Sequence, residues 1–465
     1  MKTLNILLAS FCLLGGSLAA AEPNASKPNI IFILADDLGI GSLSCYGADH
    51  FKTPNIDKLA TSGIRFEHCY SSPLCGPSRA LLMTGRYAFR TGATSNPATG
   101  PALKPANEIM MPTVLKPAGY VTAQVGKWAQ LPLDPGDWGF NEYLRFKGSG
   151  QYWNTQPTAR TYTLNGKEVR LNDGEYLPNR MHEFVVDFIT RHQNQPFYLY
   201  YSMSHIHAAI LPTPDSSPAN KKLKEGAIPL YQDNVAYMDK LVGKLMAELD
   251  RLKLREKTIV IFASDNGTAP QYPEFCTIGG KRLSGCKGTM LEGGALVPMM
   301  ISWPGTTPVG KVATNLISFC DFFPTLAELA GAKLPSGVTI DGKPFTPMFY
   351  GQTSGDWLRD WIFVLLNRHW YDRELRWKLN QDGELFDMKN GPFAESLVSA
   401  DTKDGAALAA RQRLQTVLDQ LDPAAGKVDP GNLKKNGKNA KKKKDKKQSV
   451  QAIENASQNA NAPSE

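Results

Sequence analysis

The sequence predicts an α/β fold with a doubly wound sheet. Residues 29–34 and 258–263 each form a continuous apolar run rich in β-formers, which is typical of a strand buried on both faces. Between these runs, residues 231–252 carry apolar side chains at helical spacing. Strands that alternate with helices favour a doubly wound sheet, in which ligands bind at the carboxyl ends of the strands.

The other expected elements extend this alternation along the chain. Further strands are expected at 120–125 and 196–201, and further helices at 55–62 and 323–330. After about residue 345 the pattern changes to short β-like pieces separated by turns and a last helix, which lie at 361–366, 377–379, 384–386 and 406–421. We therefore expect a large domain over residues 22–345 and a small C-terminal α+β subdomain over residues 346–423.

Both ends of the chain differ from this globular pattern. Residues 1–21 have a positive start, a short apolar run and small residues at their end, which predicts a secretory signal peptide. Residues 424–465 hold almost no large apolar side chain, so we expect a disordered tail. Nine lysines and one aspartate at 434–447 account for the whole net charge of +8, so the remainder gives no indication of a nucleic-acid surface. We expect an exported protein, secreted or periplasmic, without a transmembrane segment.

Oxygen-bearing side chains follow the two apolar runs. Asp36 and Asp37 come after the first run, and Asp265 and Asn266 come after the second. Carboxylate and amide oxygens suit a hard cation such as calcium or magnesium, and they offer nothing soft to copper or zinc. Taken alone, each pair also fits a turn or a helix cap.

Six cysteines follow the predicted signal peptide, and none of them shows the spacing of a zinc site. In an oxidising compartment disulfides are expected, for instance between Cys276 and Cys286, although the sequence does not determine the connectivity. Cys75 stands apart because it begins the segment Cys75-Gly76-Pro77-Ser78-Arg79, which Thr84-Gly85-Arg86 follows. Composition alone favours a buried structural cysteine beside a proline turn.

This segment resembles the C-x-P-S-R signature of the type I (formylglycine-dependent) sulfatases, with their downstream T-G-R, and the chain is similar to arylsulfatases. Other segments of the chain resemble that family in the same order, over residues 27 to about 345. These segments are Lys27-Pro28-Asn29-Ile30-Ile31, Asp36-Asp37-Leu38-Gly39, residues 53–60, Gly126-Lys127-Trp128, Ser264-Asp265-Asn266-Gly267, Lys287-Gly288, residues 292–298 and residues 321–326.

The resemblance implies an alkaline-phosphatase-like fold with a mixed sheet and a catalytic domain over 22–345. It also implies that a maturation enzyme oxidises Cys75 to formylglycine, whose hydrate attacks the sulfur of a sulfate ester. One calcium ion per chain is then bound by five side chains, namely Asp36, Asp37, Cys75, Asp265 and Asn266.

The resemblance further implies roles for cationic and acidic groups around that centre. Arg79 holds the formylglycine, while Lys127 and Lys287 neutralise charge on the sulfuryl oxygens. His205 matches the histidine of the family's P-H-x-P segment, although both prolines are missing, and would protonate the leaving oxygen. His207 remains open as the alternative acid or as a substrate contact.

The chain departs from the family pattern at two positions. The family usually continues G-K-W-H, whereas Ala129 follows Trp128 here, and Gln130 cannot replace a base. That histidine helps sulfate release, so the sequence does not say which group acts in this step. Leu296 stands where the family often has arginine, a change that we interpret as structural.

The sequence therefore predicts an exported sulfatase that acts on sulfate monoesters, with a sulfated carbohydrate as the expected substrate. Two alternatives remain open: a phosphate or phosphonate monoester hydrolase on the same fold, and an inactive homologue that binds sulfated glycans. Aromatic and polar side chains that could line a sugar-binding rim are Tyr152, Trp153, Asn154, His369 and Trp370.

Overall fold

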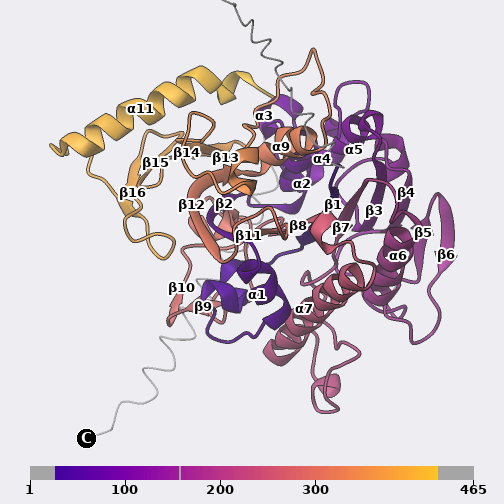
Figure 1. The fold of residues 1–465 in the computed structure, drawn as a ribbon. Coiled ribbons are helices and arrows are strands. Elements are labelled where there is room, and N and C mark those ends of the chain that lie inside the picture. The colour runs from indigo at the N-terminus through magenta and orange to yellow at the C-terminus, as the bar shows by residue number, and fades with distance from the viewer. Residues whose placement is uncertain (1–26, 157–158, 428–465) are drawn as a thin grey trace, which may run out of the picture.

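The computed structural model describes residues 27–156 and 159–427, and a ten-stranded mixed sheet forms its centre (Figure 1). The strand order is β12-β2-β11-β8-β1-β7-β3-β4-β5-β6. The strands of this sheet are β1 (Asn29–Ala35), β2 (Ile64–Tyr70), β3 (Val121–Lys127), β4 (Glu142–Phe146), β5 (Thr161–Leu164), β6 (Lys167–Arg170), β7 (Phe197–Ser202), β8 (Thr258–Ser264), β11 (Leu296–Ser302) and β12 (Lys311–Ser318). The predicted signal peptide and most of the predicted lysine-rich tail lie outside the described residues.

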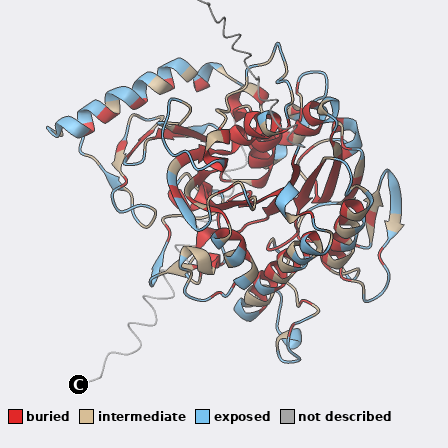
Figure 2. Ribbon diagram, in the orientation of Figure 1, coloured by how far each residue is buried: buried red, intermediate tan, exposed pale blue. Residues whose placement is uncertain are grey.

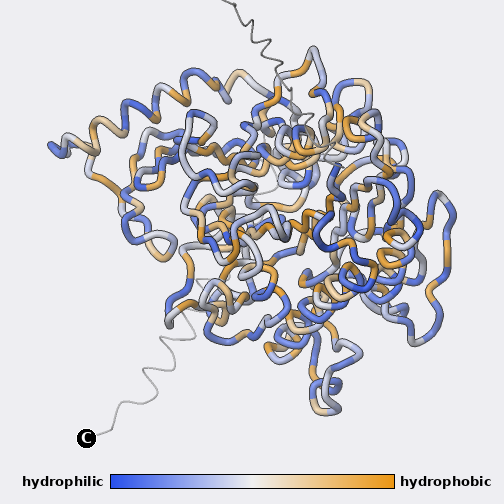
Figure 3. Tube along the Cα trace, viewed as in Figure 1, coloured by the Kyte–Doolittle hydropathy of each residue, from blue (hydrophilic) through white to orange (hydrophobic). Residues whose placement is uncertain are grey.

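The central strand β1 pairs in parallel with β7 on one side and with β8 on the other. All seven of its residues are buried, and alternate side chains enter two different apolar cores: Ile30, Phe32 and Leu34 lie in one, Ile31 and Ile33 in the other. Figures 2 and 3 show the same feature as buried, hydrophobic central strands. Because both faces of the strand are buried in apolar cores, every position of the run is apolar in the sequence.

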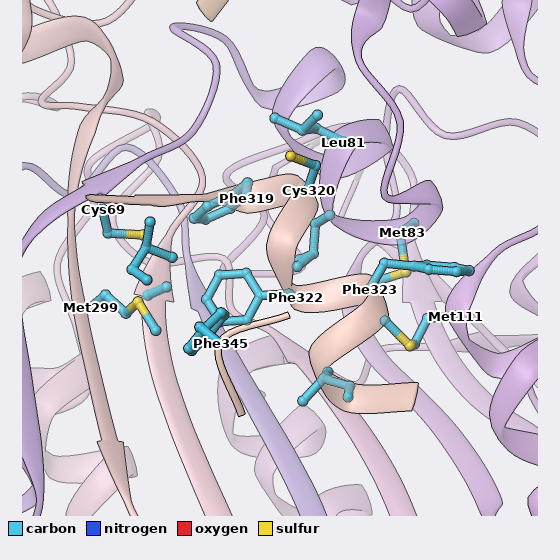
Figure 4. Packing of buried hydrophobic residues seen from close by; sticks show 14 of the residues in the cluster. Cys69, Leu81, Met83, Met111, Met299, Phe319, Cys320, Phe322, Phe323 and Phe345 are labelled. Carbon is cyan, nitrogen blue, oxygen red and sulfur yellow. The ribbon is translucent and has the colours of Figure 1, made fainter. Parts of the chain in front are cut away.

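Helices cover both faces of the sheet, which confirms the doubly wound α/β architecture. One face is covered by α1 (Pro54–Thr61), α6 (Leu177–Arg191) and α7 (Ile228–Arg251). The other face is covered by α2 (Cys75–Thr84), α3 (Ala88–Thr91), α5 (Met111–Leu115), α9 (Phe322–Leu329) and α10 (Thr346–Phe349), with α4 (Asn96–Ala102) packed on α2. Figure 4 shows how Phe322 and Phe323 of α9 reach into this second core.

The four strands and three helices expected from residues 22–345 are all present, but sequence analysis missed the other six strands of this sheet, β2, β4, β5, β6, β11 and β12, and helices such as α2 and α6. Strand β11 runs antiparallel between β2 and β8 although it contains Pro298, a residue that normally argues against a central strand. The pairing of β11 with β2 shifts register between Val297 and Met299, so Pro298 lies at this irregularity and costs no regular ladder bond.

The C-terminal part forms a second, antiparallel sheet, which confirms the expected small α+β subdomain. Its strands and helix are β13 (Ile362–Leu366), β14 (His369–Arg373), β15 (Trp377–Asn380), β16 (Leu385–Asp387), β17 (Ser396–Leu397) and α11 (Gly405–Leu421). Helix α11 packs on β14, β15 and β16 at the edge of the molecule (Figure 1). The boundary between residues 345 and 346 stays a prediction.

The structure extends slightly beyond the expected start of the tail. The backbone N–H of Lys427 donates to the carbonyl of Phe89 at 2.6 Å, so residues 424–427 lie against α3 rather than beginning a disordered segment. Two short elements complete the described secondary structure besides its 3-10 turns, namely the hairpin β9 (Thr277–Ile278) with β10 (Lys281–Arg282), and α8 (Glu292–Ala295). No helix among the described residues is long and apolar enough to cross a bilayer.

The expected disulfide between Cys276 and Cys286 is absent. All six cysteines in the described part of the chain are free thiols. The Sγ of Cys276 lies 3.2 Å from the Ser42 hydroxyl and 3.7 Å from the Tyr231 hydroxyl, inside the core between them. The Cys286 thiol instead contacts the carbonyl of Lys287, so the two sulfurs have separate partners.

Candidate active site

Two neighbouring strand ends bring the predicted oxygen ligands together. Strands β1 and β8 are parallel and pair Ala35 with Ser264, so the residues that follow them meet at the carboxyl edge of the sheet. The N–H of Asp37 donates to Oδ1 of Asp265 at 3.2 Å, and Nδ2 of Asn266 donates to Oδ1 of Asp37 at 2.9 Å. The convergence expected from residues far apart in sequence is therefore present.

Asp37 holds its position through an unusual backbone conformation. Its φ of 64° lies in the left-handed region, which aspartate tolerates better than bulkier residues but still at an energetic cost. The chain turns sharply there, which directs both Asp36 and Asp37 to the same edge. Strain of this kind gathers at functional sites, because the surrounding structure must compensate for it.

Cys75 lies beside these carboxylates as the first residue of α2. It is buried, and its Sγ is 3.7 Å from Oδ1 of Asp36 and 3.9 Å from Oδ1 of Asp37. Burial raises the pKa of the Cys75 thiol, and the charge of Asp265 raises it further. The thiol therefore stays protonated at neutral pH and is itself a poor nucleophile.

Three cationic side chains surround the same carboxylates. Nζ of Lys127, at the end of β3, is 2.6 Å from Oδ2 of Asp36, and Nζ of Lys287 is 2.5 Å from Oδ1 of Asp37. Arg79, one turn after Cys75 in α2, donates from Nε and Nη2 to Oδ2 of Asp265 at 3.0 and 2.7 Å. Its Nη2 also lies 3.9 Å from Asp36.

The sequence did not point to two further partners of Arg79. The guanidinium donates to the Ser202 hydroxyl and, at 3.3 Å, to the Tyr200 hydroxyl. Both hydroxyls belong to β7, which pairs with β1 on the side away from β8. A polar residue at the end of an otherwise apolar strand was the signal that could have identified Ser202.

The burial of this cluster changes how its groups titrate. Burial would raise the pKa of Asp36, but Lys127, His207 and Arg79 hold that pKa below its ordinary value. Burial would lower the pKa of Lys127, yet the neighbouring Asp36 raises it above the ordinary value. The pair of Asp36 and Lys127 therefore remains charged at neutral pH. In the whole cluster three carboxyl groups face three cationic side chains.

The donor set fits a hard divalent cation. Ligand atoms of Asp36, Asp37, Cys75 and His207 all lie within 4.8 Å of one another. Oδ1 of Asn266 is buried and has no hydrogen-bond partner among the described residues, so an oxygen lone pair is left for a ligand. Carboxylate and amide oxygens are the ligands that calcium prefers, and these residues are the ones that would hold it.

The structure does not bring His205 to this cluster. Its side chain is fully buried among Tyr152, Tyr176 and Tyr237, and its Nε2 lies 3.0 Å from the Tyr176 hydroxyl. Burial lowers the pKa of His205 to about 3, so the ring is neutral at neutral pH and lacks the imidazolium proton that a general acid donates. Only its backbone contacts the site, because its carbonyl accepts the N–H of Asp36 at 2.8 Å.

His207, which the sequence left open as the alternative, lies at the site instead. Its Nε2 is 3.8 Å from Oδ2 of Asp37, and 23% of its side chain is exposed. The two histidines are two residues apart, and the sequence pattern does not show which of them is buried. Tyr152, one of the expected rim residues, is also buried and donates its hydroxyl to the carbonyl of His207 at 2.8 Å.

Comparisons with known proteins agree with this geometry. Residues 28–332 match the family described as Sulfatase, and residues 286–392 match one described as N-sulphoglucosamine sulphohydrolase, C-terminal. Arylsulfatase A of Homo sapiens is 35% identical over 370 residues, which cover 72% of this chain and 70% of the relative. N-acetylgalactosamine-6-sulfatase of Canis lupus familiaris is 35% identical over 364 residues, which cover 72% and 68%.

Solved structures show the same similarity. The structure of Ps i-CgsB in complex with k-i-k-neocarrahexaose has a TM-score of 0.73 and 29% identity, and the match covers 85% of this chain and 93% of that one. The putative sulfatase yidJ from Bacteroides fragilis has a TM-score of 0.69 at 23% identity, which supports the fold alone.

Proposed function

The chain belongs to the sulfatase family and is a sulfuric ester hydrolase, and we propose that it releases sulfate from a sulfated carbohydrate. The observation that carries this proposal is the convergence of three cations and the predicted ligands on Cys75. A balanced cluster that gains a divalent cation becomes electropositive, and this charge attracts an anionic ester. N-acetylgalactosamine-6-sulfatase and the hexaose complex of Ps i-CgsB support a sugar as the substrate class.

Two groups complete the site in this proposal. Formylglycine made from Cys75 by a maturation enzyme supplies the nucleophilic hydroxyl, and calcium supplies positive charge at the sulfuryl oxygens. The raised pKa of the Cys75 thiol supports the need for such a modification, because an unmodified, protonated thiol would attack poorly. The oxygen set and the unpartnered Oδ1 of Asn266 support calcium.

The chain's own residues then have distinct tasks. Lys127 and Lys287 hold Asp36 and Asp37 in place and donate hydrogen bonds to the sulfuryl oxygens. Arg79 fixes the carboxylate of Asp265 through two hydrogen bonds and thereby sets its direction. His207, partly exposed beside Asp37, protonates the leaving oxygen in place of His205.

Export is part of the same proposal. The leader-like composition of residues 1–21 supports removal of a signal peptide, which would place the mature enzyme in the periplasm or outside the cell. N-terminal sequencing of the mature protein tests this directly, with a start after Ala21 as the expected result. A mature chain that still begins at Met1 would contradict export through this segment.

The proposed chemistry is tested by making the protein together with a maturation enzyme. Mass spectrometry of the peptide that carries Cys75 should show the thiol replaced by an aldehyde. The protein should then hydrolyse 4-nitrophenyl sulfate faster than 4-nitrophenyl phosphate, lose activity with a calcium chelator and regain it with calcium. Cys75→Ala should abolish turnover, whereas Cys45→Ala, which changes a thiol outside the site, should not. Full activity of Cys75→Ala would refute the mechanism, and faster phosphate hydrolysis would favour a phosphatase.

A further inference from the structure

A cavity of about 510 Å³ begins directly after Lys127 in the chain, at Trp128 and Ala129, and has no role in the chemistry described above. Its wall includes Ala129, Leu131, Asp134, Arg145, Phe146 and Lys147. These residues belong to the segments that follow β3 and β4 or end them. The cavity therefore lies at the carboxyl edge of the sheet, the same edge that carries Asp36 and Asp265.

The cavity is close enough to the site for one substrate to reach both. Lys127 is the last residue of β3 and pairs in register with Phe146, and the residues directly after Lys127 line the cavity. In the strand order, β7 lies between β1 and β3, and β4 follows β3. Strands are about 4.8 Å apart, so the cavity begins roughly 10–15 Å from Asp36, a distance that a short oligosaccharide spans.

Most charged groups in the cavity wall already have partners. Asp134 pairs with Arg145 and accepts the hydroxyl of Tyr143 at 3.1 Å. Asp137 accepts the backbone N–H of Asp134 at 2.9 Å. Lys147 is exposed and makes no hydrogen bond or ion pair with any residue that the structure describes. It is therefore the cation in this wall that is left to bind an anionic group.

The missing family histidine is directly connected with this cavity. Ala129 stands where the family has that histidine, and it forms part of the cavity wall. An imidazole at position 129 would occupy space that the methyl group of alanine leaves free. The departure that removes a histidine from the active-site motif thus also widens a cavity next to Lys127.

We infer that this cavity is a subsite for a sugar ring near the one that carries the scissile sulfate, and that Lys147 binds an anionic group on that ring. The exposed side chain of Leu133, which also lines this cavity, offers an apolar contact to the ring, and the polar groups of Asp134 and Arg145 lie within reach of its hydroxyls. This inference depends on the proposed carbohydrate substrate. It makes the preferred substrate a sulfated oligosaccharide rather than a single sugar or an aryl sulfate.

The test compares long and short substrates in matched variants. Initial rates are measured with 4-nitrophenyl sulfate and with disaccharides and hexasaccharides from carrageenan and heparin. Lys147→Ala should lower kcat/KM for the cleaved hexasaccharide about tenfold relative to 4-nitrophenyl sulfate, the equivalent of losing one charged contact. Ala129→His should lower the same ratio by narrowing the cavity. Lys311→Ala, an exposed lysine on β12 at the opposite edge of the sheet, should leave the ratio unchanged.

A binding measurement separates this inference from the proposed reaction. Calorimetric titration of Cys75→Ala protein with the same hexasaccharides needs no turnover, and adding Lys147→Ala should weaken that binding by a similar factor. Unchanged ratios and unchanged binding in the Lys147 and Ala129 variants would overturn the subsite. Failure of the formylglycine-bearing protein to hydrolyse any sulfate ester would overturn the proposed function instead, and the titration would still decide whether Lys147 binds the sugar.

Discussion

Two of the buried polar clusters in the described part of the chain separate function from architecture when they are compared. The first is the site cluster, formed by Asp36, Asp37, Asp265, Arg79, Lys127 and Lys287. The second, the interface cluster, joins the main sheet to the C-terminal sheet and consists of Tyr70, Glu292, Arg373, Lys378 and Glu395. In both clusters the number of carboxylates equals the number of cations.

The two clusters differ in how far they open to solvent. In the interface cluster, Arg373 lies 2.5 Å from Glu292, Lys378 pairs with Glu395, and these side chains are only 2–4% exposed. In the site cluster, Lys287 is 13% exposed and the neighbouring His207 is 23% exposed. By side-chain exposure the interface cluster is the more closed of the two, although Glu292 and Arg373 also line a cavity of about 270 Å³. We expect the more exposed cluster to receive the ligand and the more buried one to hold two parts of the fold together. The predictions below test this difference.

The largest expected effect is the loss of activity when Lys127 becomes methionine. Lys127→Met removes a cation that contacts Asp36 and is aimed at the sulfuryl oxygens, so kcat/KM should fall by about 10²–10³. The measurement is the rate with 4-nitrophenyl sulfate, at a temperature where circular dichroism shows the variant folded. A loss of less than about tenfold would mean that Lys127 does not stabilise the transition state.

The corresponding change in the interface cluster should affect stability rather than rate. Arg373→Met leaves Glu292 buried without its cation, which should cost about 3–5 kcal/mol of unfolding free energy. The kcat/KM of the folded variant should stay within about threefold of the parent, since Arg373 is distant from the reacting atoms in this proposal.

Arg376→Met is the matched control for Arg373→Met. Arg376 pairs with Asp387 on the surface, where its side chain is 53% exposed, so its loss should cost no more than about 1 kcal/mol. Urea denaturation measures both variants. Equal destabilisation by the two substitutions would contradict the distinction between buried and surface pairs, and a rate loss without destabilisation in Arg373→Met would extend the active site into the interface cluster.

Much of the fold could be predicted because the central strands are uninterrupted apolar runs, and such runs indicate burial on both faces of a sheet. Strand β1 is apolar at every position from Ile30 to Leu34, since both of its faces are covered. Strands β2 and β12 were missed because polar residues such as Arg65 and Glu67 interrupt them, and β11 because it contains Pro298. The register shift that lets β11 accommodate a proline depends on the pairing with β2, so the residues of β11 alone do not reveal it.

The site could be predicted in part for a related reason. Asp36, Asp265 and Lys127 each end or follow a strand, and strand order alone brings such residues to one edge. His205 could not be distinguished from His207, because the chain leaves regular structure after β7 and the direction of each ring depends on tertiary packing. The disulfide expected between Cys276 and Cys286 failed for the same reason, since the burial of Cys276 beside Tyr231 depends on tertiary contacts.

A buried carboxyl group on β14, Asp372, lies outside both clusters and tests what happens without a partner cation. Both side-chain oxygens of Asp372 on β14 lack a hydrogen-bond partner within the described chain, and burial raises the pKa of Asp372 to about 8. The folded state therefore binds this proton more tightly than the unfolded state, where the pKa is close to 3.8. The contribution to stability is fully present below about pH 4 and is lost as the pH rises to 8.

Asp372→Asn removes that ionisation, so it should stabilise the protein more at pH 8 than at pH 5. The difference between the two pH values should be about 4 kcal/mol at most, because one pKa unit corresponds to about 1.4 kcal/mol. Urea denaturation of both proteins at the two pH values gives this number. Asp382→Asn, an exposed change in the same subdomain, should show no such difference. An equal effect of Asp372→Asn at both pH values would mean that the carboxyl titrates normally.

The smallest expected effects come from one identical substitution made in each cluster. The hydroxyl of Tyr70 donates to Oε2 of Glu292 at 2.8 Å, and the hydroxyl of Tyr200 accepts from Nη1 of Arg79 at 3.3 Å. Both tyrosines are fully buried, so Tyr→Phe removes almost no apolar surface in either place. It removes the Arg79 contact of Tyr200, and at Tyr70 it removes both the bond to Glu292 and the one that the hydroxyl accepts from Nη1 of Arg373 at 2.6 Å. Each change should cost about 1 kcal/mol: Tyr70→Phe in the free energy of unfolding, and Tyr200→Phe in the activation free energy of the reaction.

Tyr70→Phe should lower the unfolding free energy and leave kcat/KM unchanged, because the interface cluster does not meet the substrate. Tyr200→Phe should lower kcat/KM about fivefold, since a less constrained Arg79 orients Asp265 less well for the reaction. The two variants serve as controls for each other, because the chemical change is the same and only the cluster differs. If both variants lost stability alone, or both lost rate alone, openness to solvent would not be what separates the two clusters, and the role of Arg79 in holding Asp265 would need another explanation.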